Sequence, residues 1–293
     1  MTVAAERLGV LCARIGLCSR NEAAKYARLG QILVDGQPAK SAAALVPGTA
    51  NIQLTPRAQR MQDDKVTILL HKPAHYASCR AGKGVPLARK LLVPENRAPS
   101  CRTRHDPRQL SKLDATDVLD EATSGVLLFS QDGRVSTTVA RDPLVEKEYD
   151  ILTNGEVTSG QLSALQLNLG TLCSQDARVR EVPGYVPRAE KARLLQADPA
   201  AVVEEAKPSA SSRIQVVFCG TLTSSDLRQM CSQAGMLLFR VSRVRVGGIS
   251  LAKLVPGQWT VVPGVEPLLR ERSHFPAAEE KRPSRRTLRS MHE

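Results

Sequence analysis

The sequence predicts an α+β protein, in which a small module of two helices and a hairpin precedes a larger domain of mixed, largely antiparallel sheet with surrounding helices. Three observations predict this class. Helical spacing and a hairpin turn both occur within the first 57 residues. Apolar runs such as 66–73 and 125–132 are typical of buried strands, and the strands and helices along the chain are mixed without strict alternation. The chain has 293 residues, 42% of them hydrophobic, which is enough for two domains with buried cores.

Two short helices are predicted at the start of the chain. Apolar residues recur at helical spacing in the stretch ERLGVLCARIGL, and Gly16 is expected to end this helix. Ser19, followed three residues later by Glu22, has the pattern of a capping box and predicts a second helix over about 20–29. Gly30 is expected to end that helix.

A hairpin is predicted after the helices. The stretch QILVDGQPAK reads as a strand, an Asp35-Gly36 turn and a return strand. Basic residues outnumber acidic ones in this module. The basic residues of the two predicted helices are Arg7, Arg14, Arg20, Lys25 and Arg28. A compact cationic module suits the backbone or the groove of an RNA helix. On charge alone, an ordinary solvated helix surface is the alternative.

The larger domain is expected after a polar linker at 59–65. Its first buried strand, VTILLHKP, is stopped by Pro73, and a long basic loop with a short helix near 84–92 follows. The later elements mix strands and helices without strict alternation. In chain order they are a strand at 125–132, a helix in RVSTTVARD, a strand in VEKEYDILTNG, a helix in SGQLSALQLNL, a strand in RIQVVFCG, a helix in SSDLRQMCSQAG, and strands in LLFRVSRVRVGGI and QWTVVPG.

Composition and charge limit the binding partners, cofactors and compartments that we expect for this protein. Lys and Arg outnumber Asp and Glu by 41 to 29, and the resulting charge of +12 favours a polyanion such as nucleic acid. Seven cysteines without a CxxC pair, together with five histidines, predict no metal site and a reducing compartment. No apolar run has transmembrane length, and no clear signal peptide precedes the first helix. We therefore expect a cytoplasmic or organellar-matrix protein, mitochondrial in a eukaryote, and neither secretion nor membrane association.

The stretch VLDEATSGVLLFSQDG places Asp120 immediately before a Thr-Ser-Gly turn and a buried strand. Most aspartates in such positions are turn formers whose carboxylate accepts from a nearby N–H. A carboxylate beside a basic loop can also perform chemistry on a bound polyanion. The sequence around Asp120 is needed to distinguish a turn-forming aspartate from a catalytic one.

The order of these features resembles two known families. The stretch RLGVLCARIGLCSRNEAAKYARLGQILVDGQ resembles an S4-type RNA-binding domain, with its Arg-Leu start, GLCSR turn, basic second helix and hairpin. VLDEATSGVLLFSQDG, followed by VEKEYDI, resembles the core of the RsuA-type RNA pseudouridine synthases, and VTILLHKP and FRVSRVRVGGISLAKLVPGQW resemble their first and closing strands. The resemblance covers about 6–263. It implies an S4-like domain at 1–58 and a pseudouridine-synthase-like catalytic domain at 66–265. The remaining segment, 266–293, is basic and lacks apolar periodicity, so we expect a flexible tail that adds RNA affinity, with an inert solvated terminus as the alternative.

The resemblance also implies roles for single residues. Asp120 corresponds to the catalytic aspartate of an isomerase that converts uridine in RNA to pseudouridine without cofactor or metal. Tyr149 would stack on the everted base, and Lys147, on the same strand face, would touch a phosphate. An ordinary strand tyrosine and a surface lysine are the alternatives. Asp114 is excluded as the catalytic residue because only Asp120 lies three residues before the threonine of the turn.

Two departures from the family pattern bear on activity. The family's arginine two residues before the catalytic aspartate, which pairs with it, is Val118 here. The RNA-gripping segment at 221–230 keeps Arg228 but has lost most of its cations. The implied function is therefore a pseudouridine synthase acting on ribosomal RNA, with transfer RNA as another substrate class. The alternative is a weak or inactive relative that binds ribosomal RNA during ribosome assembly. A monomer that contacts a pre-ribosomal particle is expected in either case.

Overall fold

The N-terminal module contains the two predicted helices. The computed structural model describes residues 5–103, 105–142, 144–172, 177–182 and 211–262. Helix α1 covers Leu8–Arg14 and α2 covers Arg20–Arg28. The predicted capping box is present, because the Ser19 hydroxyl accepts from the Glu22 N–H and the Glu22 carboxylate accepts from the Ser19 N–H. Buried apolar side chains of both helices share one small core.

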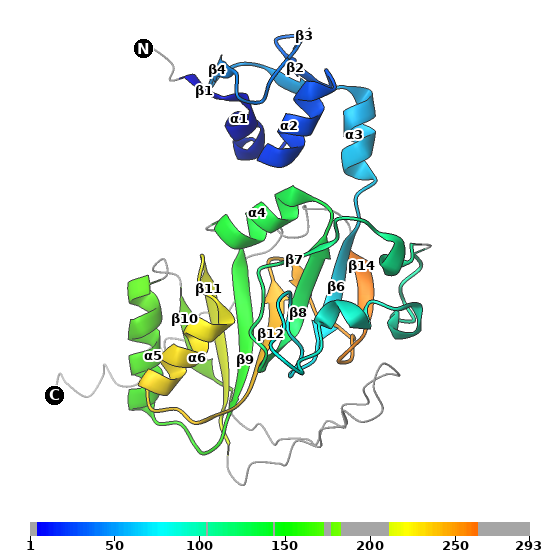
Figure 1. The fold of residues 1–293 in the computed structure, drawn as a ribbon. Helices are drawn as coiled ribbons and strands as arrows, with labels where there is room; N and C mark the ends of the chain where they lie inside the picture. The colour runs from blue at the N-terminus through cyan, green and yellow to red at the C-terminus, as the bar shows by residue number, and fades with distance from the viewer. Residues whose placement is uncertain (1–4, 104, 143, 173–176, 183–210, 263–293) are drawn as a thin grey trace, which may run out of the picture.

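Five short strands complete the module in two small sheets (Figure 1). Strand β1 (Ala5–Arg7) pairs with β4 (Leu45–Pro47), and β2 (Ile32–Val34) pairs with β3 (Gln37–Pro38) and β5 (Ile52–Leu54). The hairpin turn has positive φ angles at Asp35 and Gly36, as its predicted type requires. The expected hairpin is confirmed.

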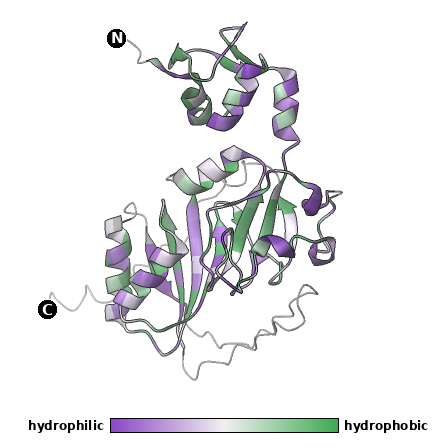
Figure 2. Ribbon diagram, viewed as in Figure 1, coloured by the Kyte–Doolittle hydropathy of each residue, from purple (hydrophilic) through white to green (hydrophobic). Residues whose placement is uncertain are grey.

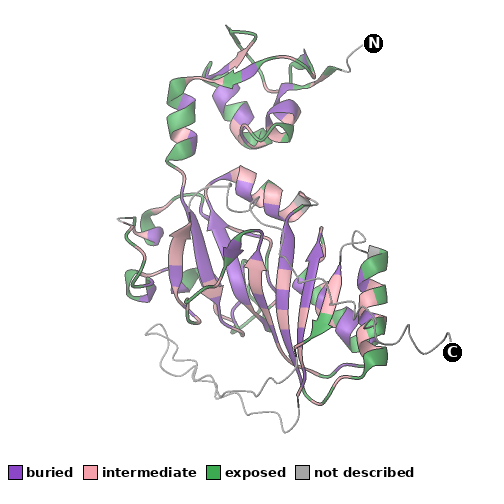
Figure 3. Cartoon of the chain, turned by 180° about the vertical axis from the view of Figure 1, so that it is seen from behind, coloured by how far each residue is buried: buried purple, intermediate pink, exposed green. Residues whose placement is uncertain are grey.

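The predicted linker is largely a helix. Helix α3 covers Pro56–Asp63, with the Thr55 hydroxyl as its N-cap and proline at its first position. These two residues are a regular helix-start signal, but the polar composition of the segment hides it. Most of α3 is hydrophilic and exposed (Figures 2 and 3), while Ala58 and Gln62 are buried. The connection between the two domains is therefore an ordered helix, not an extended tether.

Glu22 joins the module to the end of α3. Its carboxylate forms an ion pair with Lys65 and accepts from the Gln62 amide at 3.3 Å and from the Ser19 N–H at 2.7 Å. Burial raises the pKa of Glu22, but Lys65 and the Ser19 N–H outweigh burial and lower it to about 2.

We expect Glu22→Gln to destabilise the protein by about 2 kcal/mol at neutral pH. The folded-state pKa lies below the ordinary value of a glutamate, so this stabilisation is complete above about pH 4.5 and is lost as the pH falls toward 2. Urea unfolding of both proteins at pH 7 and pH 3 measures the difference. A gap of equal size at the two pH values would contradict the assigned pairing.

A nine-stranded sheet forms the larger domain in the described part of the chain. The main order is β10-β11-β9-β12-β8-β6-β14, with β13 on β12 and β7 on β8. Only β12 and β8 run parallel among the described neighbours. The strands are β6 (Thr67–Lys72), β7 (Asp114–Thr116), β8 (Thr123–Ser130), β9 (Glu146–Thr153), β10 (Arg178–Glu181), β11 (Arg213–Cys219), β12 (Leu238–Val246), β13 (Ile249–Ser250) and β14 (Trp259–Val262). The predicted α+β class with a largely antiparallel sheet is confirmed.

Helices cover both faces of this sheet. Helices α5 (Ser159–Leu172) and α6 (Ser224–Gln233) pack against β9 and β11 in the large core, and α4 (Gly133–Arg141) covers the other face of β8. The long loop carries three 3-10 turns, at Ala88–Leu91, Pro94–Asn96 and Pro107–Gln109. No helix in the described ranges is long and apolar enough to cross a membrane. The predicted basic tail at 266–293 lies outside those ranges.

The two domains touch where α2 begins and α4 begins (Figure 1). A Cβ atom placed on Gly133 would lie 2.6 Å from the Ser19 Cβ and 2.7 Å from its hydroxyl oxygen. Such distances are closer than van der Waals contact allows. Only a residue without a side chain fits at Gly133 with the domains in this position.

Candidate active site

The loop between β7 and β8 holds Asp120 in a fixed position. Its backbone N–H donates to the Ser224 hydroxyl at 2.9 Å, which ties the loop to the start of α6. The Ser78 hydroxyl accepts from the Leu119 N–H at 3.0 Å and donates to the Leu119 carbonyl at 2.7 Å. Both serines are buried. Two segments distant in sequence therefore fix the backbone at Asp120 and at the residue before it.

The Asp120 carboxylate is half-buried and is bonded to its own turn. One oxygen accepts from the Thr123 N–H at 2.9 Å, and the other accepts from the Thr123 hydroxyl at 2.8 Å. Within the described part of the chain, no Lys or Arg nitrogen lies within 4.0 Å of this carboxylate. Val118, where the family has its pairing arginine, is 41% exposed. The carboxylate is oriented by neutral donors and not by a cation.

A different aspartate of the same loop receives the buried cations. Arg243, 1% exposed on β12, donates to the Asp117 carboxylate at 2.6 Å, to the Asp117 carbonyl at 2.8 Å and to the Val126 carbonyl at 2.9 Å. The Lys147 ammonium lies 3.0 Å from the same Asp117 oxygen. Asp117 thus lies between two buried cations, a role for which the sequence carries no local signal.

Tyr149 lies inside the same region. It is fully buried, and its ring stacks on Phe218 with centroids 5.4 Å apart and planes 9° apart. Burial raises the pKa of Tyr149 to about 12, with a lowering contribution from Arg243 and raising contributions from Asp117 and Asp120. Arg243, Asp117 and Asp120 therefore all lie close enough to the Tyr149 hydroxyl to affect its ionisation. Base stacking by Tyr149 stays a prediction, and it requires the packing on its other face to open.

Lys72 is a further buried cation near Asp120. Its ammonium donates to the Tyr76 carbonyl at 2.6 Å, to the Pro73 carbonyl at 3.1 Å and to the Glu121 carbonyl at 3.3 Å. Burial lowers the pKa of Lys72 to about 8, although the nearby carboxylate of Asp120 opposes that effect. The site therefore contains an ammonium group whose charge is only partly stabilised.

The predicted RNA-contacting residues fall into two groups. The five cations of the N-terminal module are all exposed, and Arg228 is half-buried on α6. Lys147, in contrast, is 1% exposed and ion-paired with Asp117. The predicted phosphate contact of Lys147 does not fit this burial, because alternation along β9 directs the side chain into the large core with Tyr149. Asp114 is exposed on β7, away from the buried charges.

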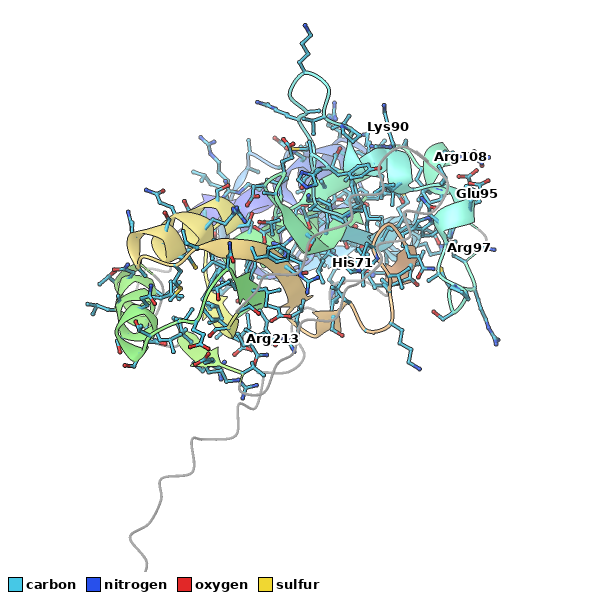
Figure 4. All side chains as sticks on the ribbon, turned by 90° about the horizontal axis from the view of Figure 1, so that it is seen from below. His71, Lys90, Glu95, Arg97, Arg108 and Arg213 are labelled. Atoms are coloured by element: carbon cyan, nitrogen blue, oxygen red, sulfur yellow. The ribbon has the colours of Figure 1, made fainter. Side chains whose placement is uncertain are left out.

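The long loop adds basic side chains beside the sheet. Lys90, Arg97 and Arg108 lie on the same side of the domain as Glu95, and Arg213 lies away from them (Figure 4). Some of these cations form hydrogen bonds within the loop, since Arg97 donates to the Thr103 carbonyl at 3.0 Å. Arg108 pairs with Asp106 at 2.7 Å. The described residues contain no group of three or more His, Cys, Asp or Glu side chains arranged to hold a metal ion.

Comparisons with known proteins agree in both parts of the chain. The S4 domain family matches residues 6–52. The chain is 32% identical over 146 residues to ribosomal large subunit pseudouridine synthase E of Xanthomonas campestris, a match that covers 49% of this chain and 73% of that protein. It is 26% identical over 303 residues to ribosomal large subunit pseudouridine synthase B of Vibrio cholerae, covering 98% of this chain and 79% of the relative. A solved pseudouridylate synthase structure matches 89% of this chain and 97% of its own, with 17% identity and a TM-score of 0.45.

Proposed function

The chain belongs to the RsuA-type family of RNA pseudouridine synthases, and from this premise we propose that it isomerises a uridine of ribosomal RNA to pseudouridine. In this reaction the bond between C1′ and N1 of the nucleotide breaks, the uracil turns over, and C1′ joins C5. The C5 proton is lost and N1 gains one, so the overall composition of the RNA is unchanged. No redox partner or cofactor is needed to balance the reaction.

Asp120 is the residue to which we assign the chemistry. The observation that carries the assignment is the fixed, half-buried position of its carboxylate near the buried Lys72 ammonium and the buried Tyr149 hydroxyl. A carboxylate oxygen in such a position can attack C1′ or remove the proton from C2′. The uridine has to leave its stack to reach it, because C1′ is inaccessible inside an RNA helix.

The N-terminal module is proposed to hold the RNA. Its cations Arg20, Lys25 and Arg28 are exposed on one helix, where they can neutralise phosphates. Transfer RNA is a second substrate class for this module, and a pre-ribosomal particle is the proposed setting. We place the protein as a monomer in the compartment that contains the RNA, which is the cytoplasm or an organellar matrix.

We expect Lys25→Ala to weaken RNA binding and to reduce the slope of log affinity against log salt concentration by about 1, since one phosphate contact is lost. Filter binding to a ribosomal RNA fragment at a series of salt concentrations measures the slope. Lys253→Ala is the matched control, because Lys253 is exposed in the loop between β13 and β14 of the other domain. An unchanged slope in Lys25→Ala would remove this helix from the proposed interface.

The test of the function is modification of unmodified RNA. The purified protein is incubated with transcribed ribosomal RNA, and pseudouridine is mapped by carbodiimide adducts and primer extension. Appearance of a new pseudouridine stop at one position supports the proposal. Tight RNA binding without any modification would contradict it.

A second candidate function is supported by one observation, the absence of a cation from Asp120 within the described residues. A carboxylate without a positive partner is a poorer site for charge developing in the reaction. The second candidate is a weak or inactive synthase-like protein that binds ribosomal RNA during ribosome assembly. It predicts RNA binding by the N-terminal module with no pseudouridine formed.

A further inference from the structure

Two carboxylates of one loop compete for the same buried cations. Asp117 and Asp120 are three residues apart between β7 and β8. Asp117 takes the Arg243 guanidinium and the Lys147 ammonium, while Asp120 accepts only from Thr123 among the described residues. We propose that Asp117 is a positioning residue that holds Arg243 away from Asp120 and thereby limits the rate of isomerisation, an inference that rests on the proposed function.

The register of β12 with β8 places Arg243 beside the loop that carries both aspartates. On β12 it is in register with Gly125 of β8, and Val241 of β12 is in register with Thr123, the residue that binds the Asp120 carboxylate. Arg243 and Asp120 both act on the charge of Lys72, and both act on the Tyr149 hydroxyl. A guanidinium so close to two carboxylates pairs with the one that presents the better geometry.

The geometry favours Asp117 because it offers two acceptors. Its carboxylate and its carbonyl each accept from a different nitrogen of Arg243, at 2.6 and 2.8 Å. The backbone of Asp117 adopts φ +44°, which turns its carbonyl toward the guanidinium. A non-glycine residue in this conformation is uncommon, and Asp and Asn tolerate it better than most. An asparagine at this position therefore keeps the turn while it removes the negative charge.

Loss of that charge should release Arg243. A neutral amide at position 117 no longer compensates two buried cations, and the nearest ionised carboxylate on the loop is then Asp120. A guanidinium that pairs with Asp120 would orient its carboxylate for attack, which is the role that the resemblance assigns to an arginine at the position of Val118.

The experiment compares wild type with Asp117→Asn, and Asp114→Asn serves as the matched control because Asp114 is exposed. For Asp117→Asn we expect a crystal structure with the Arg243 guanidinium on the Asp120 carboxylate. We also expect a single-turnover rate of pseudouridine formation about tenfold higher. Asp114→Asn should match wild type in both measurements.

Asp117→Asn removes the partner of two buried cations. A second variant therefore tests the inference in case that substitution disrupts folding. Val118→Arg leaves Asp117 in place and supplies a guanidinium from an exposed position, so it should raise the rate by a similar factor.

The possible outcomes separate the two proposals. If wild type modifies RNA but neither Asp117→Asn nor Val118→Arg is faster, the inference is overturned while the function stands. If Arg243 remains bonded to the new amide in the crystal structure of Asp117→Asn, the competition is also overturned. If neither wild type nor any variant forms pseudouridine, the proposed function fails, and with it the rate limit assigned to Asp117. Activity in the variants alone would support the inference about Asp117 and would contradict the proposed activity of the wild-type protein.

Discussion

Replacing Asp120 by asparagine is expected to reduce pseudouridine formation by about 10²–10⁴-fold or more, because the amide can neither attack C1′ nor accept the C2′ proton. The substitution should leave the fold intact. The new amide carbonyl can accept from the Thr123 N–H, and the amide N–H can donate to the Thr123 hydroxyl in place of the present bond. Single-turnover assays with excess enzyme measure the loss without interference from product release.

The control for this variant is again Asp114→Asn, which should retain full activity. RNA binding and the thermal unfolding midpoint of Asp120→Asn should match wild type, so that a lost rate is assigned to chemistry. If modification continued in Asp120→Asn at more than about a tenth of the wild-type rate, Asp120 would lose its assigned role. Its carboxylate would then be a turn former, as most aspartates before such turns are.

Gly125→Ala is expected to prevent folding of the larger domain. A Cβ atom at Gly125 would lie 2.1 Å from the Arg243 carbonyl oxygen and 2.6 Å from the Arg243 nitrogen, and the residue has φ +115°. The obstacle is backbone, which cannot rotate away as a side chain can. Since β8 and β12 are neighbours in the middle of the sheet, their separation would open the core, and we expect a loss of more than about 4 kcal/mol.

Gly155→Ala is the matched control for that substitution. Gly155 also has a positive φ, +106°, but a Cβ atom there would meet nothing within 4 Å. Its cost should be limited to backbone strain of about 1–3 kcal/mol. Urea unfolding and the yield of folded protein measure both variants. Equal losses in the two would mean that strain alone, and not the close approach of β8 and β12, makes Gly125 necessary.

The parts of the fold that could be predicted are those with local signals. Ser19 and Glu22 form their capping box, the Asp35-Gly36 turn has the expected backbone, and the helix in RVSTTVARD is α4. Helix α3 was missed because its hydrophilic residues suggest a linker, although Thr55 before a proline marks a helix start. The order of strands in the sheet could not be derived, because pairing between distant strands leaves no local trace in the sequence.

In the candidate site, too, features with a local sequence signal could be predicted, and contacts between distant segments could not. The loop around Asp120 was identified from its Thr-Ser-Gly turn and its resemblance to a family, but the partners of the loop were not. Arg243 is 126 residues from Asp117, and Ser224 is 104 residues from Asp120. Lys147 was expected at the surface because lysine usually is. Its burial depends on a carboxylate from another segment, which only the folded chain reveals.

The contact of Gly133 with Ser19 has a consequence for target choice. Because the two domains meet there without room for a side chain, the contact restricts the distance between the N-terminal module and the Asp120 carboxylate. A synthase with this geometry would select a uridine by its distance from the RNA helix that the N-terminal module binds, as much as by the base sequence around it.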